Sequence, residues 1–296
     1  MYKKGLFFGV ATALVTPFDG KKVDYPAFGE LIDRQIEAGI DALVICGTTG
    51  EPCSLSPYER EKVLEYALGR AKKRTFMIAG TGTSDTKRTC AMTKKAALLG
   101  YDAALVVTPY YNKTSQQGLE EHYAAVSACA DIPLIVYNVP ARTGMNVFPS
   151  TYLRLARIET VSGAKEASGD FLQHTQSIEK CKSSGLYCYC GSDEYALAAL
   201  ALGADGIISV LSNVFPKLAL RLYCLVENGN MQEAQELWRL LFPFVRELFC
   251  TVNPSPVKYA LSLLGVCKSS VRLPLAEPDA AEKLRIASAM EPLRHL

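Results

Sequence analysis

Short runs of apolar residues alternate with longer segments of helical periodicity through most of the chain. The runs are rich in Val, Ile, Leu and Ala and do not alternate with polar residues, which is typical of strands buried on both faces of a parallel sheet. A helix-patterned segment follows each of them. The eight runs span residues 6–15, 42–46, 76–79, 103–107, 134–137, 161–164, 186–190 and 206–210.

Helix boundaries are also visible in the sequence. Ser56 and Glu59, with a proline between them, form a capping box that predicts a helix start. Asp24 is expected to cap another helix, which would end at Gly39. The inward face of that helix would consist of Phe28, Leu31, Ile32 and Ile36.

A glycine, a variable residue and an aspartate recur directly before three of the runs, at residues 39–41, 100–102 and 203–205. The glycine would end a helix in a left-handed turn, and the aspartate would begin the next strand. Eight strand–helix units in roughly 225 residues predict the α/β class and a (β/α)8 TIM barrel. A doubly wound sheet is the alternative, but it usually has fewer strands and a phosphate-binding fingerprint, which the sequence lacks.

The alternation of strand-like runs with helix-patterned segments ends after Asn228. Residues 231–249, 256–264 and 279–290 are patterned as three helices with no strand between them. We therefore expect a catalytic barrel at residues 1–228 and a small C-terminal all-helical domain at residues 229–296. No linker separates the two, so we expect the helices to pack on the barrel.

Composition narrows the possible functions. The chain has 296 residues, 49% of them hydrophobic, and a formal net charge of +2 without basic clusters, so neither nucleic acid nor a lipid surface is an expected partner. The apolar stretch after the first four residues is interrupted by Thr12, Thr16 and Pro17, which favours a strand over a signal segment. Apolar runs stay short of the ~18 residues of a membrane helix. We predict a soluble, cytoplasmic protein.

Cysteine and histidine placement argues against disulfides and metals. The ten cysteines are scattered and include no Cys-x-x-Cys pair, so buried free thiols in a reducing compartment are expected. His122, His174 and His295 are far apart in sequence, which disfavours a zinc site and a histidine-based triad.

One apolar run ends in a lysine. Lys165 directly follows residues 161–164 and precedes a turn composition at residues 168–170. Burial disfavours an ammonium and lowers the pKa of a lysine amine, which an amine nucleophile needs to form a Schiff base. The simpler interpretation is a strand-end lysine paired with Glu166.

The other strand ends strengthen the catalytic interpretation, because barrel active sites lie at the carboxyl ends of the strands. These ends carry a Gly47–Gly50 turn suited to a carboxylate, the phenol of Tyr137 for proton transfer, and Arg142 for a second carboxylate. Taken singly, each has an ordinary structural explanation as loop, core or surface residue. Together they suit imine chemistry on an anionic keto acid.

Five motifs of the chain are shared with one known family. They span residues 47–51, 107–112, 137–144, 163–167 and 253–258. In these motifs the chain resembles the dihydrodipicolinate synthases, now called 4-hydroxy-tetrahydrodipicolinate synthases, and the resemblance runs from the first strand to the last helix. It implies condensation of pyruvate with L-aspartate 4-semialdehyde, the first committed step towards diaminopimelate and lysine, without a cofactor.

The resemblance also implies roles for single residues. Lys165 would be the Schiff-base lysine, and Thr48, Tyr137 and Tyr111 would form a proton relay, with Tyr111 reaching in from a neighbouring subunit. Such sharing implies at least a homodimer, and the family pattern suggests a homotetramer built as a dimer of dimers. The implied substrate-binding residues are Thr48, Thr49, Arg142, Gly191 and Ile208.

Alternatives remain at this stage. Related Schiff-base aldolases act on sugar acids of the N-acetylneuraminate or 2-keto-3-deoxy-gluconate type, and they generally lack an arginine at the place of Arg142. A catalytically silent sensor barrel and a pyridoxal-phosphate enzyme are more distant possibilities, the latter disfavoured by the missing phosphate-binding loop.

Regulation is a point of departure from the family. Lysine-inhibited relatives carry a histidine, an asparagine and a glutamate beside a tyrosine that matches Tyr110. Here Arg60 or Pro57, Ser84 and Arg88 occupy the aligned positions. An arginine in place of a carboxylate reverses the charge complementarity to lysine, so we expect weak or absent feedback inhibition.

Overall fold

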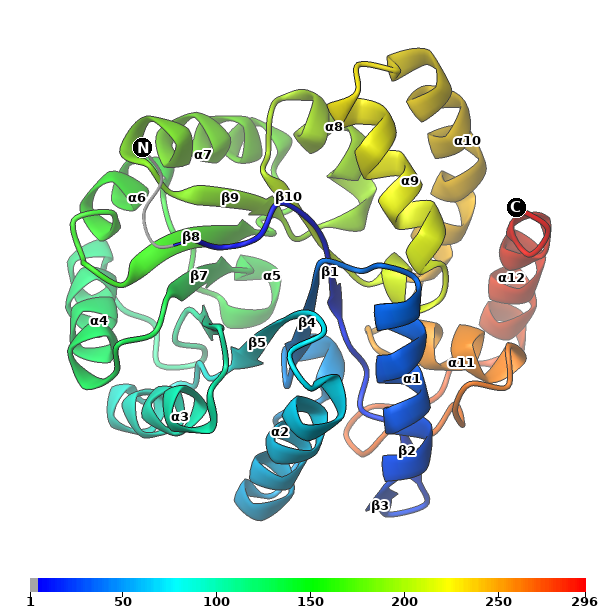
Figure 1. Cartoon of the computed structure of the whole chain (residues 1–296), viewed down its shortest axis with the longest axis horizontal. Helices are drawn as coiled ribbons and strands as arrows, with labels where there is room; N and C mark the ends of the chain where they lie inside the picture. Colours follow the sequence, from blue (N-terminus) through cyan, green and yellow to red (C-terminus); the bar gives the residue numbers. More distant parts are fainter. Residues whose placement is uncertain (1–4) are drawn as a thin grey trace. The chain divides into compact units, whose positions relative to one another are not determined.

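A computed structural model describes residues 5–296 of the chain (Figure 1). Eight parallel strands form a closed barrel in the order β1-β10-β9-β8-β7-β6-β5-β4, which confirms the predicted fold class and all eight strand positions. Residues 1–4, which precede the apolar stretch compared above with a signal segment, lie outside the described residues. The barrel strands are β1 Gly9–Ala13, β4 Ala42–Ile45, β5 Phe76–Gly80, β6 Ala103–Val107, β7 Leu134–Asn138, β8 Val161–Glu166, β9 Tyr187–Cys190 and β10 Gly206–Ser209.

Helices follow the strands, and the three helices expected near the C-terminus are present as α10, α11 and α12. A two-stranded hairpin, β2 Phe18–Asp19 and β3 Lys22–Val23, was not predicted, because strands of two residues leave no periodic signal. The helices are α1 Tyr25–Glu37, α2 Pro57–Ala71, α3 Thr86–Leu99, α4 Gln116–Cys129, α5 Pro140–Thr143, α6 Pro149–Leu155, α7 Phe171–Ser184, α8 Ala196–Ala201, α9 Pro216–Glu227, α10 Met231–Glu247, α11 Ser255–Leu263 and α12 Ala280–Met290.

The chain divides into two compact units. The first unit contains residues 5–8 and Phe76–Ile208, and the second contains Gly9–Thr75 and Ser209–Leu296. In the first unit, helices α4, α6 and α7 cover the outer side of strands β7 to β9 (Figure 1). In the second unit, β1 pairs with β4, and α10 packs against α9 and α12. The domain boundary at residue 228 remains a prediction.

The recurring glycine and aspartate have a defined structural role. Gly39, Gly100 and Gly203 have φ values of 86°, 95° and 87°, the left-handed conformation predicted for helix ends. Each following aspartate makes two hydrogen bonds to the neighbouring strand. The Asp205 carboxylate accepts the N–H of Cys188 at 2.7 Å, and the Asp205 N–H donates to the Cys188 carbonyl at 2.9 Å.

The same reciprocal pair of hydrogen bonds joins the starts of β4 and β6 to their neighbouring strands. Asp41 exchanges two such bonds with Val10, and Asp102 exchanges two with Met77. The aspartates therefore clamp β4 to β1, β6 to β5 and β10 to β9 at the points where these strands begin. The sequence repeat marked the strand starts but gave no indication of these bonds across the sheet.

Both predicted helix starts are confirmed. Ser56 and Glu59 form the reciprocal capping box, and the Asp24 carboxylate accepts the N–H of Ala27. The predicted inward face of α1 is wrong at one position, because Ile36 is half-buried and Gln35 is fully buried. The Gln35 side chain donates to two backbone carbonyls and accepts the Thr12 hydroxyl, so its amide is satisfied in the core.

We expect Asp205→Ala to lower the free energy of unfolding by about 1–3 kcal/mol, because the buried N–H of Cys188 would lose its acceptor. Asp205→Asn keeps an oxygen at the same place and should lose clearly less. Urea unfolding of the three proteins measures the difference. Equal stability of wild type and Asp205→Ala would contradict the clamp.

Candidate active site

Lys165 occupies the carboxyl-terminal end of β8 and is 5% exposed. Strand β7 places Tyr137 directly opposite it, and the Lys165 Nζ lies 4.4 Å from the centroid of the Tyr137 ring. Among residues 5–296, no carboxylate forms an ion pair with Lys165. The simpler interpretation of a Lys165–Glu166 pair is therefore wrong.

Glu166 points to the opposite face of β8, as the alternation of side chains along a strand requires. Its fully buried carboxylate accepts hydrogen bonds from Asn138 Nδ2 at 3.1 Å, Tyr152 Oη at 3.0 Å and Ser177 Oγ at 3.1 Å. The backbone N–H of Ser168 donates to it as well, at 2.8 Å. Tyr152 and Ser177 lie on the outer helices α6 and α7, so Lys165 lies on the inner face of the strand.

Gly191, at the end of β9, leaves room for the lysine side chain. A Cβ at this position would lie 2.7 Å from Cε and 2.9 Å from Cγ of Lys165. Both separations are shorter than side-chain atoms tolerate. The predicted pocket position of Gly191 thus has a steric basis, because only glycine allows Lys165 its present path.

Three further predicted residues belong to the first unit. Arg142 is exposed on the short helix α5, which follows β7, and Ile208 is buried in β10. Tyr111 lies in the loop after β6 with a left-handed φ of 65°, and it is 92% exposed. A tyrosine this exposed is unusual for a role within its own subunit, and it is compatible with a role in another.

Thr48 and Thr49 belong to the second unit. They begin a single 3-10 turn, Thr48–Gly50, directly after β4. The N–H groups of Gly50 and Glu51 close this turn, whereas no acceptor within residues 5–296 takes the N–H of Thr48 or Thr49. The turn therefore presents two backbone donors and a threonine hydroxyl, a combination suited to an anionic group.

The structure also bears on the cysteines, on metal binding and on membrane-spanning helices. All ten cysteines are free thiols, of which four are buried, four half-buried and two exposed, so the expectation of burial is only partly correct. Within residues 5–296, no group of three His, Cys, Asp or Glu side chains is arranged to hold a metal ion. In the same range, no helix combines the length and apolar character needed to cross a bilayer.

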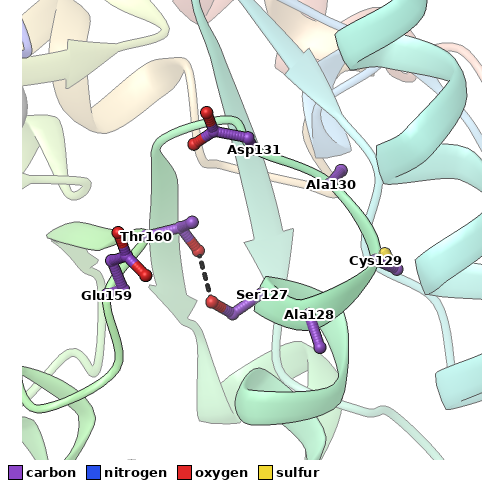
Figure 2. Close-up of a pocket in the computed structure, with 7 residues that line it drawn as sticks. All are labelled: Ser127, Ala128, Cys129, Ala130, Asp131, Glu159 and Thr160. Carbon is purple, nitrogen blue, oxygen red and sulfur yellow. Dashed lines mark hydrogen bonds between the residues drawn. The ribbon is translucent and has the colours of Figure 1, made fainter.

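A hollow of about 410 Å³ lies at the amino-terminal side of β7 and β8, away from the end that carries Lys165. Figure 2 shows its lining, in which the Thr160 hydroxyl donates to Ser127 Oγ at 2.9 Å and the carboxylates of Asp131 and Glu159 lie nearby. This end of a barrel ordinarily serves stability rather than catalysis.

Two histidines of the first unit are buried. Burial lowers the pKa of His122 and of His174 to about 4, with nearby Asp85 opposing the shift in His122. The Thr86 hydroxyl pairs with Nδ1 of His122 at 2.9 Å, and within residues 5–296 neither ring nitrogen of His174 has a hydrogen-bond partner. Both imidazoles are thus neutral in the folded protein at neutral pH.

We expect Gly191→Ala to displace the amine of Lys165 and to slow imine formation with pyruvate at least about a hundredfold. Borohydride trapping followed by mass spectrometry measures that rate. Gly69→Ala is the matched control, because Gly69 lies within α2 with open space around it. Equal trapping rates in the two variants would contradict the steric role of Gly191.

The two buried histidines predict acid sensitivity. As the pH falls from about 6.5 to about 4, the unfolded chain binds protons on these imidazoles while the folded chain stays neutral, so the free energy of unfolding should decrease. Each histidine accounts for up to about 3 kcal/mol. Urea unfolding at a series of pH values should show a smaller loss for His174→Phe than for wild type. An identical loss would count against this assignment.

Comparison with known proteins agrees with these features. The sequence profile of the Dihydrodipicolinate synthetase family matches residues 6–292. The 4-hydroxy-tetrahydrodipicolinate synthase of Syntrophus aciditrophicus is 42% identical over 286 residues, which cover 97% of this chain and 98% of the relative.

Solved structures of the same family also resemble this chain over nearly its whole length. The dihydrodipicolinate synthase of Thermotoga maritima has a TM-score of 0.96 and 38% identity, covering 99% of this chain and 100% of that one. The Acinetobacter baumannii dihydrodipicolinate synthase, solved in complex with pyruvate, has a TM-score of 0.95 and 37% identity, with 98% and 100% covered. The resemblance inferred from five motifs is confirmed over almost the whole length, and the chain belongs to the dihydrodipicolinate synthetase family.

Proposed function

We propose that the chain is a 4-hydroxy-tetrahydrodipicolinate synthase, a lyase that condenses pyruvate with L-aspartate 4-semialdehyde on the diaminopimelate route to lysine. Family membership supports the reaction class. The structural observation that carries the proposal is Lys165, a buried amine on the inner face of a strand end with an aromatic ring beside it. No carboxylate within residues 5–296 forms an ion pair with it.

Lys165 supplies the nucleophile. Its amine nitrogen adds to the ketone carbon of pyruvate, and loss of one water gives an imine. Conjugation with the imine makes the methyl protons of the bound pyruvate acidic, so removing one of them gives an enamine. The enamine carbon then forms the new bond to the aldehyde carbon of the second substrate.

These steps need proton transfers, which we assign to Tyr137, Thr48 and Tyr111. Tyr137 shares the inner face with Lys165 and lies within reach of the same bound carbonyl group. The high exposure of Tyr111 suits a phenol that completes the site of another subunit. The assembly we infer is at least a homodimer, and a homotetramer as a dimer of dimers follows the family pattern.

Each of the two substrates carries one carboxylate, and we assign a separate binding group to each. The open N–H groups of Thr48 and Thr49 suit the carboxylate of pyruvate. Following the family pattern, we also assign Gly191 and the Ile208 carbonyl to pyruvate binding. Arg142, exposed on α5 directly after the strand that carries Tyr137, suits the carboxylate of the semialdehyde. Each of these residues lies at or directly after the carboxyl end of a barrel strand, where barrel active sites are found.

Two further assignments complete the proposal. The cytoplasm is the compartment we infer, because ten free thiols persist where a reducing glutathione pool maintains them.

We also infer weak or absent feedback inhibition by lysine, since Ser84 and the exposed Arg88 stand where inhibited relatives carry an asparagine and a glutamate. Lysine added at millimolar concentration should leave the rate almost unchanged.

A pair of assays tests the reaction. The purified protein should consume pyruvate and L-aspartate 4-semialdehyde together in a coupled assay, and it should release no pyruvate from N-acetylneuraminate or a 2-keto-3-deoxy sugar acid. Turnover of a sugar acid without turnover of the semialdehyde would overturn the proposed substrate. No turnover of either would overturn the enzymatic assignment.

We expect Arg142→Ala to lower kcat/KM for the semialdehyde by about 100-fold or more, because a charged hydrogen-bonded pair with the substrate would be lost. Imine formation with pyruvate should stay close to wild type, since it precedes binding of the second substrate. Arg142→Lys is the matched variant, and it should recover only part of the loss because it lacks the bidentate fork. Unchanged turnover in Arg142→Ala would contradict the assignment.

A further inference from the structure

The stretch at residues 253–258, one of the five motifs that carry the family resemblance, has no role in the reaction described so far. Lys258 lies on α11 in the second unit, and its side chain is 0% exposed. Its ammonium forms an ion pair with Glu51, donates to the Ser270 carbonyl at 2.9 Å and lies 4.0 Å from the centroid of the Phe18 ring. A buried lysine with this many contacts holds specific groups in place.

The partner of Lys258 terminates the turn that carries Thr48 and Thr49. Glu51 has a left-handed φ of 53°, and its N–H donates to the Thr48 carbonyl at 3.1 Å. Cys46, on the other side of the turn, is also left-handed, with a φ of 56°. Two left-handed residues other than glycine are costly, so contacts from outside the turn must maintain this conformation.

Those outside contacts converge on Glu51. Besides the ion pair with Lys258, its other carboxylate oxygen accepts the backbone N–H of Arg272 at 3.1 Å. The N–H and hydroxyl of Ser54 donate to the Glu51 carbonyl at 3.1 and 3.0 Å. Both carboxylate oxygens and the carbonyl are thereby fixed, and the strongest of these contacts comes from α11.

Asn253 acts on the turn directly. Its side-chain Nδ2 donates to the Thr49 hydroxyl at 3.0 Å, and both residues are buried. Because the Thr49 oxygen accepts from Asn253, its own proton is directed elsewhere and remains available for donation. Thr16 fixes the next residue by donating its hydroxyl to the Gly50 carbonyl at 2.8 Å.

We propose that Asn253 and Lys258 are positioning residues for the pyruvate-binding turn: Asn253 orients the Thr49 hydroxyl, and Lys258 holds Glu51 and hence the left-handed end of the turn. The inference rests on the proposed function, in which this turn receives the carboxylate of pyruvate. It gives the C-terminal helices a part in substrate binding, although they contribute no atom that touches substrate.

The variant Asn253→Ala tests the proposed orientation of the Thr49 hydroxyl by Asn253. The KM for pyruvate and its half-saturating concentration in borohydride trapping should rise about tenfold, while KM for the semialdehyde stays near wild type. Gln35→Ala is the matched control, since it removes another buried amide of the second unit that makes no contact with the turn. A similar loss of stability in both variants, with a change of pyruvate KM only in Asn253→Ala, is the expected result.

Lys258→Met alone would leave Glu51 buried without its counter-ion and could prevent folding. The double variant Glu51→Gln/Lys258→Met removes both charges, and it should fold because the remaining amide can still accept from Arg272. We expect its pyruvate KM to rise at least about tenfold. Circular dichroism and urea unfolding establish that each variant is folded before the constants are compared.

The outcomes separate this inference from the proposed function. Wild-type protein that forms no borohydride-trapped pyruvate adduct would overturn the function. Wild type that forms the adduct, beside folded variants with unchanged pyruvate KM, would overturn the positioning roles alone. Equal KM changes in Asn253→Ala and Gln35→Ala would also overturn them, because the effect would then follow stability rather than contact with the turn.

Discussion

The buried carboxylate of Glu166 is the constraint on which the geometry of strand β8 depends. Consecutive residues of a strand point to opposite faces, so a lysine on the inner face of β8 leaves its neighbour among the outer helices. A carboxylate buried there is costly unless hydrogen bonds compensate for lost water. Neutral donors from Asn138, Tyr152 and Ser177 provide that compensation, and Lys165 is not needed as its counter-ion.

The same network fixes the geometry of Lys165 and Tyr137, the two groups proposed to react. Asn138 on β7 is opposite Glu166 on β8, and their hydrogen bond joins the two strands on the outer face. One residue earlier on each strand, Tyr137 and Lys165 meet on the inner face. The register that satisfies the outer carboxylate is therefore the register that pairs the amine with the phenol. Burial, together with the nearby carboxylate of Glu166, raises the pKa of Tyr152, which keeps that phenol a hydrogen-bond donor.

The second unit solves a comparable problem in another way. There the backbone N–H donors lie on the turn Thr48–Gly50 rather than on a strand. The buried ion pair between Lys258 and Glu51 fixes the left-handed end of this turn. Burial lowers the pKa of Lys258, and the charge of Glu51 opposes this shift. In both units, buried side chains that are not assigned to substrate binding determine where the residues of the proposed site point.

The fold was predictable because its strands are buried on both faces and leave continuous apolar runs such as residues 103–107. Lys165 was predictable for a related reason, since one amine at the end of an apolar run stands out. Neither signal exists for partners that meet only in three dimensions. The exchange of inward position between Ile36 and Gln35, and the bonds of Glu51 and Asn253, depend on contacts between segments up to about two hundred residues apart.

The most direct measurement of the central claim is peptide mapping after reduction of the protein with borohydride in the presence of pyruvate. The account predicts one adduct, on the peptide that contains Lys165, and none when pyruvate is omitted. An unmodified Lys165, or an adduct at another buried lysine such as Lys258, would contradict it.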